Sequence, residues 1–156
     1  MRITLLQVGK TEQKWLQEGF AEYERRLRHY IRFESRVIPS LKLSRSISES
    51  QQNKLEAELI LKNIPERSLI ILLDDKGKQY SSEDFAVSLQ NKMNTGVQHL
   101  VFIIGGPYGF DQVIYQKANE KLSLSKMTFS HQMVRPIFLE QLYRAFTILR
   151  NEPYHH

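Results

Sequence analysis

The sequence contains no cysteine, and it has only seven glycines, five prolines and no long hydrophobic run. The absence of cysteine excludes a disulfide-stapled scaffold, a thiolate zinc site, an iron–sulfur cluster and a mechanism with a cysteine nucleophile. No apolar stretch is long enough to span a bilayer, and the apolar run within residues 1–10 is too short for a secretory signal. We therefore expect a cytoplasmic protein without a membrane partner.

Metal ligands are also scarce in this chain. Without cysteine, a metal site would depend largely on the five histidines, which stand at positions 29, 99, 131, 155 and 156. No interior pair has the spacing at which two imidazoles bind one ion. We therefore expect no bound metal.

Apolar residues alternate between strand-like runs and helix-like stripes along the 156 residues. Short apolar runs predict strands over residues 3–8, 33–39, 69–73, 100–104 and 122–125. Apolar residues repeated every three or four positions predict helices over residues 16–30, 48–64, 82–95, 110–119 and 136–150. This alternation is typical of an α/β fold with a mainly parallel sheet and helices on both faces. Because the length suits one domain and no linker interrupts it, we expect residues 1–156 to form a single domain.

The polar, serine-rich stretch over residues 40–50 predicts a mobile loop. At its end Ser48 and Gln51 have the spacing of a capping box, in which two side chains satisfy backbone N–H groups at the start of a helix. Pro65 is expected to end that helix, because proline lacks the N–H group that a helix needs.

Basic residues outnumber acidic ones by 22 to 17, and the excess is concentrated at the two ends of the chain. Residues 1–50 carry ten basic and six acidic side chains, residues 51–119 carry seven and eight, and residues 120–156 carry five and three. A polyanion that meets both ends on one surface would suit this distribution. Many soluble proteins carry a similar excess without binding nucleic acid, so charge alone leaves the partner open.

Ligands of open parallel sheets bind beyond the carboxyl ends of the strands, where loops and helix N-termini converge. Three loops are expected there, over residues 74–79, 105–109 and 126–133. The glycines of GGPYG at 105–109 would let a ligand approach the backbone, although a plain tight turn would use them equally well. Neither GxGxxG nor Gly-Lys-Ser/Thr is present, so no dinucleotide fingerprint or P-loop is supported. Apolar and small side chains at 126–133 would suit an adenine ring.

Polar residues toward the end of the chain have two interpretations each. His131 either faces a ligand or caps the following helix. Arg144 lies one helical turn from Glu140. The two residues form either a functional pair or a surface ion pair that contributes little to stability. The tail NEPYHH at 151–156 is either functional or frayed.

Five segments together resemble the RlmH family of ribosomal RNA methyltransferases. They are MRITLLQVGK, LLDDKGK, FIIGGPYGF, LSLSKMTFSHQMVRPIFLEQLYRAF and NEPYHH. The similarity covers essentially the whole chain, and the segment from Leu122 to Phe146 is its most specific part. It implies a SPOUT-class fold with a C-terminal trefoil knot, which connection rules would not predict. It also implies a homodimer that transfers a methyl group from S-adenosyl-L-methionine to N3 of a pseudouridine in 23S rRNA of assembled ribosomes.

The resemblance places the family's cofactor site in the three expected loops. The corresponding residues are Leu73, Gly105, Leu124, Ser125, Lys126, Met127, Thr128 and Phe129. Asp75 departs from the family, whose members carry an apolar residue there, which leaves the polarity of this edge of the pocket open.

We further hypothesise which residues surround the target base. The predicted catalytic residues are Arg144, Tyr154, His155 and His131. We expect the tail to come from the partner subunit, and His131 to contribute more to the shape of the pocket. The predicted RNA-binding residues are Arg25, Arg26, Arg28 and Arg135, the first three as phosphate contacts.

The chemistry of the implied reaction agrees with the residues present. Methyl transfer from a sulfonium is an in-line displacement, so the protein must fix geometry and make a lone pair available on the acceptor. The N3 proton of pseudouridine is acidic, so a mild base or a nearby cation would suffice. Methylation at pyrimidine C5 typically needs a cysteine nucleophile. The absence of cysteine is therefore consistent with methylation of a nitrogen atom. Two alternatives stay open on the residues alone, a nucleotide-binding oxidoreductase and a non-enzymatic ribosome-binding α/β module.

Overall fold

Five parallel strands form the centre of the structure, a computed structural model that describes residues 1–40 and 47–155. The strands are β1 (Arg2–Val8), β2 (Arg32–Ile38), β3 (Leu69–Lys78), β4 (His99–Ile104) and β5 (Glu120–Leu122). Their order across the sheet is β2-β1-β4-β3-β5, and each neighbouring pair is parallel. The predicted parallel sheet is therefore confirmed.

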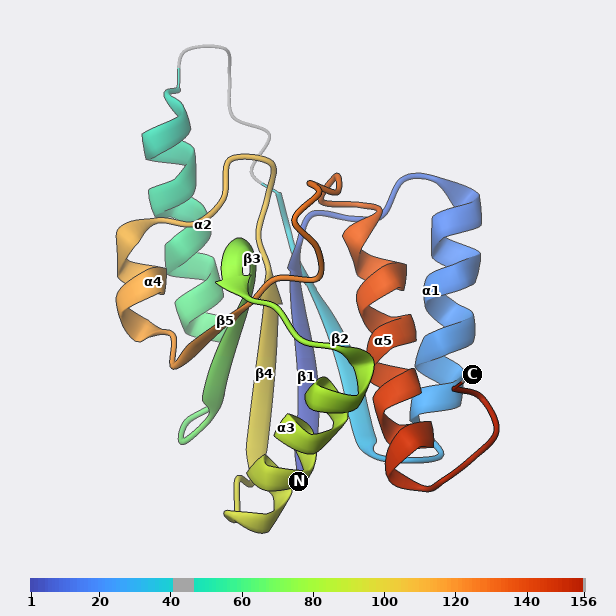
Figure 1. Ribbon diagram of the computed structural model, residues 1–156. Helices are drawn as coiled ribbons and strands as arrows, with labels where there is room; N and C mark the ends of the chain where they lie inside the picture. The colour runs from blue at the N-terminus through green and yellow to red at the C-terminus, as the bar shows by residue number, and fades with distance from the viewer. Residues whose placement is uncertain (41–46, 156) are drawn as a thin grey trace.

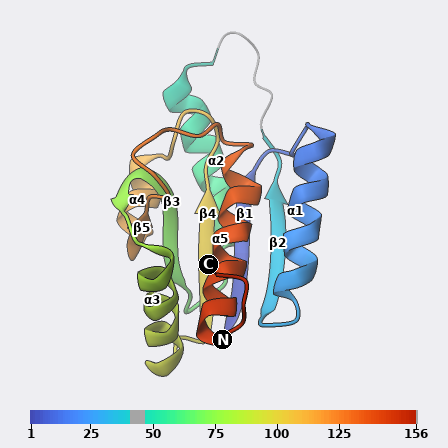
Figure 2. The same cartoon turned by 45° about the vertical axis from the view of Figure 1, so that its right-hand side comes forward.

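Helices cover both faces of this sheet, as Figures 1 and 2 show. They are α1 (Lys14–Leu27), α2 (Glu49–Asn63), α3 (Ser82–Asn94), α4 (Gln112–Lys117) and α5 (Val134–Leu149). Helices α1, α3 and α5 lie on one face, with α5 between the other two, and α2 and α4 lie on the other face. The predicted α/β fold with helices on both faces is confirmed.

The middle strands β1 and β4 are buried on both faces. All residues from Leu100 to Ile104 are almost completely inaccessible to solvent, as the continuous apolar run LVFII predicts. Successive residues point to opposite faces. Phe102 packs against Phe138 of α5, with ring centroids 4.7 Å apart, and Ile103 belongs to the core on the α2 side. These two cores hold the sheet rigidly between the helices and leave its two ends available for sites.

The start of α2 is fixed by the predicted capping box. Gln51 N–H donates to Ser48 Oγ at 3.2 Å, and Ser48 N–H donates to Gln51 Oε1 at 3.1 Å. These two bonds satisfy backbone groups that the first helical turn leaves free. Residues 41–46 of the predicted mobile loop lie outside the described residues, so that expectation stays a prediction.

The main difference from the sequence prediction concerns residues 74–78, which we expect from sequence to form a loop but which extend β3. Lys78 pairs with Leu122 of β5 beyond an irregularity that follows Leu73. Glycine at 77 permits this close pairing, because a Cβ there would lie 2.6 Å from backbone atoms of Leu122. Helix α1 begins two residues and ends three residues earlier than the helix predicted over 16–30, the helix predicted over 110–119 is shorter than expected, and β5 ends at Leu122.

Residues 1–40 and 47–155 contain neither a helix suited to a membrane nor a cluster of metal-binding side chains. In this part of the chain, no helix combines the length and the hydropathy that crossing a membrane requires. Within the same residues, no three histidine or carboxylate side chains gather as metal ligands would.

Candidate active site

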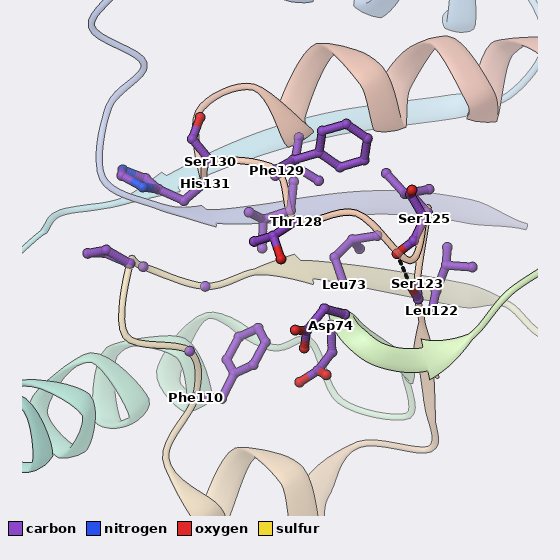
Figure 3. A pocket seen from close by; sticks show the side chains of 18 of the residues that line it. Leu73, Asp74, Phe110, Leu122, Ser123, Ser125, Thr128, Phe129, Ser130 and His131 are labelled. Carbon is purple, nitrogen blue, oxygen red and sulfur yellow. Dashed lines mark hydrogen bonds between the residues drawn. The ribbon is translucent and has the colours of Figure 1, made fainter.

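A pocket opens at the carboxyl edge of the sheet, beside the middle of β3 and at the end of β4 (Figure 3). Its volume is about 380 Å³, which falls within the range of small-molecule sites. Four parts of the chain line it, residues 73–75 in β3, residues within 104–110 at and after the end of β4, Tyr115 in α4, and residues within 122–134 from the end of β5 to the start of α5. Apart from Tyr115, these are the places where the sequence predicts ligand contacts.

The glycine segment after β4 is a tight turn that also forms a wall of the pocket. Gly109 N–H donates to the Gly106 carbonyl at 3.3 Å, and Gly109 has a φ of 75°, which favours glycine. A Cβ on Gly105 would lie 3.0 Å from the Phe110 ring, and one on Gly106 would lie 3.0 Å from the Glu56 carboxylate. Both interpretations of GGPYG therefore apply, since the turn brings its own backbone to the pocket.

Side-chain hydrogen bonds to the backbone shape the segment between β5 and α5. Ser123 Oγ donates to the Ser125 carbonyl at 2.9 Å, and Ser125 Oγ accepts from Met127 N–H at 2.9 Å. Ser130 Oγ accepts from Met133 N–H at 3.1 Å. These bonds hold the backbone without regular secondary structure, so the segment can present small and apolar side chains to the pocket.

Asp74 is a pre-oriented carboxylate at the edge of the pocket. Tyr115 Oη donates to Asp74 Oδ2 at 2.6 Å, and Lys76 N–H donates to Asp74 Oδ1 at 2.8 Å. Burial alone would raise the pKa of Asp74, but these two hydrogen bonds and the nearby Lys121 lower it below its ordinary value. Burial and the carboxylate raise the pKa of Tyr115. At pH 7 Asp74 is therefore ionised and Tyr115 is neutral.

The pocket carries negative charge in a chain whose net charge is +5. Asp74 and Asp75 line it, and of the described residues no lysine or arginine does. His131 also lines the pocket, and burial together with the charge of Arg135 lowers the pKa of this imidazole below its ordinary value of 6.5. His131 is therefore neutral at pH 7. Such a pocket suits a neutral or cationic ligand and disfavours a phosphate group.

Seven of the eight predicted cofactor residues line this pocket, namely Leu73, Gly105, Leu124, Ser125, Met127, Thr128 and Phe129. Lys126 is exposed and does not line it. Sequence reasoning missed Phe110 and Tyr115, whose rings pack edge to face with centroids 5.8 Å apart. The sequence signal that could have identified them is their position, since Phe110 directly follows GGPYG and Tyr115 lies in the short helix α4 after it. Helix α5 has no side-chain cap, so the alternative that His131 caps it is wrong.

Arg144 and Tyr154 form one cluster with Glu140. Arg144 Nη2 lies 2.6 Å from Glu140 Oε1, and the guanidinium lies over the Tyr154 ring, 4.7 Å from its centroid. Tyr154 Oη donates to the same carboxylate oxygen at 3.2 Å and lies 3.3 Å from Tyr23 Oη. Burial, Tyr23 and Glu140 raise the pKa of Tyr154. Arg144 and Glu140 are thus a partly buried pair that fixes the tail, rather than an isolated surface pair.

The tail lies far from the pocket of its own chain. His155 Nε2 lies 2.7 Å from Glu83 Oε1 at the start of α3. Arg144 is ten residues along α5 from the pocket residue Val134, which corresponds to about 15 Å of helix. The tail passes close to α1, where Tyr154 lies near Tyr23, and its last described residue, His155, reaches the start of α3. Of the predicted catalytic residues, His131 lines the pocket and the other described ones do not.

Arg135, a predicted RNA contact, is 0% exposed. Its Nη2 donates to the Val8 carbonyl at 2.7 Å, and its Nη1 donates to Thr11 Oγ1 at 2.8 Å. Its Nε is buried and has no partner among the described residues. This interior position corrects the expectation of a direct RNA contact. Arg135 instead joins the start of α5 to the end of β1.

Arg25 and Arg26 lie in α1 and Arg28 directly follows it, and each is paired with a glutamate of that helix. Glu22 lies 2.9 Å from Arg25 and 2.7 Å from Arg26, and Glu24 lies 3.4 Å from Arg28. These pairs reduce the positive charge that α1 presents to solvent. The role of the three arginines as phosphate contacts stays a prediction.

The fold and the pocket together define a class of protein. A parallel α/β sheet with a pocket at its carboxyl edge is typical of a protein that binds a small ligand there, and the acidic lining of this pocket disfavours a phosphate group. A family described as "Predicted SPOUT methyltransferase" matches residues 1–155. The chain belongs to this family, and it is a methyltransferase of the SPOUT class.

Individual relatives agree with this assignment over the full length. The chain is 54% identical to "Ribosomal RNA large subunit methyltransferase H" of Christiangramia forsetii and 56% identical to the protein of the same name from Flavobacterium johnsoniae. Each comparison covers 100% of this chain and 99% of the relative. The structure of a probable methylase family protein from Haemophilus influenzae is similar with a TM-score of 0.52 at 15% identity, over 99% of this chain and 70% of that one. This last likeness concerns the fold.

Proposed function

We propose that this protein is a cytoplasmic homodimer that transfers the methyl group of S-adenosyl-L-methionine to N3 of a pseudouridine in 23S rRNA of the assembled ribosome. The names of the relatives support an RNA substrate from the large ribosomal subunit. The pseudouridine, its N3 atom and the trefoil knot are expected from the resemblance described above.

The charge of the pocket is the observation that carries the choice of cofactor. S-adenosyl-L-methionine has a sulfonium cation and an adenine ring but no phosphate. Asp74 and Asp75 would favour the cation, and the seven predicted residues that line the pocket would hold the rest of the molecule. The dinucleotide of an oxidoreductase carries a pyrophosphate, for which the described pocket offers no cationic partner. The methyltransferase is therefore the better fit.

The residues of this chain would contribute positioning and charge to the reaction. When bound, the cofactor supplies an activated methyl group. The protein must then hold the acceptor nitrogen in line with the methyl group and stabilise the negative charge that develops when N3 gives its proton to solvent water. Arg144 would supply the stabilising cation, oriented by Glu140 at 2.6 Å. The neutral hydroxyl of Tyr154 and the imidazole of His155 would position the base.

The distance between these groups and the pocket supports a homodimer. In one chain the two are separated by about 15 Å along α5, which is too far for one base to touch both. A second subunit packed against α5 would bring its own Arg144–Tyr154 cluster to this pocket. The active site would then contain cofactor residues from one subunit and the tail of the other.

A methyl-transfer assay with labelled S-adenosyl-L-methionine tests this function. The acceptor is ribosomes that lack the modification, and the labelled nucleotide is then mapped. We expect label on N3 of one pseudouridine in 23S rRNA. Label at another position would contradict the substrate assignment, and ribosome binding without any cofactor affinity would favour the non-enzymatic alternative.

Deletion of residues 153–156 tests the composite site. We expect methyl transfer to fall by at least about 100-fold, because an interaction needed in the transition state is worth several kcal/mol. The affinity for S-adenosyl-L-methionine, measured by calorimetry, should stay within about twofold, because the tail does not line the pocket of its own chain. Unchanged turnover would contradict the role of the tail.

A further inference from the structure

A second hollow lies at the opposite, amino edge of the sheet. Its volume is about 980 Å³, and it is lined by the beginnings of β1, β2, β3 and β4 and by the turns before β3 and after α3. In Figure 1 this edge is the lower end of the sheet, near the label N. We call it the amino-edge groove, and its charged lining residues are Arg2, Arg32, Arg67 and Glu66.

The three guanidinium groups of the groove form no ion pair within the described residues. Glu34 is near Arg2, but its carboxylate contacts other residues. It pairs with Arg36 at 2.9 Å and accepts a hydrogen bond from Thr4 Oγ1 at 2.9 Å. Burial alone would raise the pKa of Glu34, and Thr4, Arg36 and Arg2 lower it. The groove therefore keeps an excess of positive charge.

His99 lines the groove without adding to this charge. Thr4 Oγ1 donates its hydrogen to Glu34, so it accepts from His99 Nε2, which lies 2.7 Å away. Burial, Arg2 and Arg36 lower the pKa of His99, so this imidazole is neutral at pH 7. The positive charge of the groove thus resides on its arginines.

Two local features of these arginines are unfavourable for the fold itself. Arg2 and Arg32 are register partners on adjacent strands, where like charges destabilise a sheet. Arg67 has a φ of 56°, a left-handed conformation that costs energy for any residue with a Cβ and would suit glycine. Folding stability therefore does not account for arginine at these positions, whereas contact with an external anion would.

The arrangement of the arginines fits an extended anion better than a single phosphate group. Arg32 begins β2, Arg2 begins β1, and Arg67 lies two residues before β3. In the order β2-β1-β4-β3 these positions cover three spacings between strands, which is about 14 Å. That length corresponds to several successive phosphates of a nucleic-acid strand.

We propose that the amino-edge groove is a second RNA-binding surface, in which Arg2, Arg32 and Arg67 contact backbone phosphates of ribosomal RNA away from the methylated base. The proposal rests on the proposed function for the identity of the polyanion. It differs from the predicted contacts of α1, because Arg25, Arg26 and Arg28 are each paired with a glutamate while the groove arginines are not.

Salt-dependent binding to large ribosomal subunits tests this surface. The triple variant Arg2→Gln, Arg32→Gln, Arg67→Gln removes three charges from the groove. Its matched control is Lys14→Gln, Lys54→Gln, Lys62→Gln, which removes three charges from exposed residues outside it. We expect the groove variant to reduce the slope of log affinity against log salt by about two to three, because each phosphate contact contributes about 0.7 to 0.9. The control should reduce it by less than about one.

The outcomes separate this proposal from the proposed function. Calorimetric affinity for S-adenosyl-L-methionine should be the same in all three proteins, which also shows that the variants fold. If the parent protein methylates ribosomes and the groove variant binds them with the same salt slope as the control, the groove proposal is overturned and the methyltransferase stands. If the parent protein neither binds nor methylates ribosomes, both fail.

A pair of single variants at position 67 provides an independent test. Arg67→Gly removes the charge and relieves the left-handed backbone, so we expect weaker ribosome binding together with an unchanged or higher melting temperature. Arg67→Lys keeps the charge, so its binding should resemble that of the parent protein. A lower melting temperature for Arg67→Gly with unchanged binding would show that Arg67 serves the fold, which would overturn its part in the proposal.

Discussion

The two edges of the sheet carry opposite charge. At the carboxyl edge, Asp74 and Asp75 line a pocket of about 380 Å³ without a described lysine or arginine. At the amino edge, Arg2, Arg32 and Arg67 line a larger groove of about 980 Å³ with one carboxylate. The net charge of +5 for the whole chain does not reveal this difference between the two edges.

The difference explains how a protein that binds RNA can keep a small ligand pocket free of phosphates. Positive charge on the surface attracts the polyanion, whereas the negative pocket repels it. The proposed cofactor, which carries a sulfonium cation, has the opposite preference. We therefore predict that the affinity for RNA and the affinity for the cofactor change differently with salt, with charge neutralisation and with pH.

The largest expected difference is the response to salt. Between about 50 and 200 mM salt, three phosphate contacts would reduce the affinity for ribosomes by about 40-fold through counterion release. The affinity for S-adenosyl-L-methionine should change by less than about twofold, because the molecule carries a single net charge. Filter binding and calorimetry over the same salt series measure the two quantities. Equal salt dependence would remove the contrast between the edges.

Neutralising Asp74 should have the next largest effect. We expect Asp74→Asn to weaken binding of S-adenosyl-L-methionine by about tenfold, which is about 1.4 kcal/mol. The product S-adenosyl-L-homocysteine, whose net charge is zero, should be affected less, because it lacks the sulfonium cation. The ratio of the two affinities is measured by calorimetry.

Two further variants sharpen the result for Asp74. Asp75→Asn removes the same charge from a more exposed position, so solvent screening should make its effect smaller. Tyr115→Phe removes the hydrogen bond of 2.6 Å that orients Asp74 and should lower both affinities alike. If Asp74→Asn weakens product and substrate equally, the pocket does not select for positive charge.

The smallest expected effect is the pH dependence of cofactor binding. Burial and Arg135 lower the pKa of His131 below 6.5, so the imidazole is neutral at pH 7 and gains a proton as the pH falls below its lowered pKa. A positive charge would then enter the pocket and weaken binding of S-adenosyl-L-methionine by about threefold. The variant His131→Gln should abolish this pH dependence. Asp74 stays ionised in the same range, because its pKa is lowered too.

Most of the fold could be predicted from sequence because its signals are local. The runs at 69–73 and 100–104 are strands buried between two layers, and the Ser48–Gln51 spacing marks the start of α2. The extension of β3 through residues 74–78 was not predictable in this way. It depends on the close approach of Leu122 to Gly77, two residues far apart in sequence.

The site was predictable to a different degree at each position. Three of the lining segments follow from the rule for parallel sheets and from the resemblance, so their location was accessible. The burial of Arg135 was not, because its partners Val8 and Thr11 lie more than 120 residues earlier. The amino-edge groove also escaped detection, since its arginines are isolated in sequence and meet through strand register.

The bond from Arg135 to the Val8 carbonyl has a consequence for synthesis of the protein. It joins the first strand to the last helix, and β1 pairs with β4, which is made almost 100 residues later. Contacts between such distant residues form slowly during folding. The first strand can pair early with β2, but it meets β4 and Arg135 only when most of the chain has been translated, and the pocket is complete once α5 has emerged and packed.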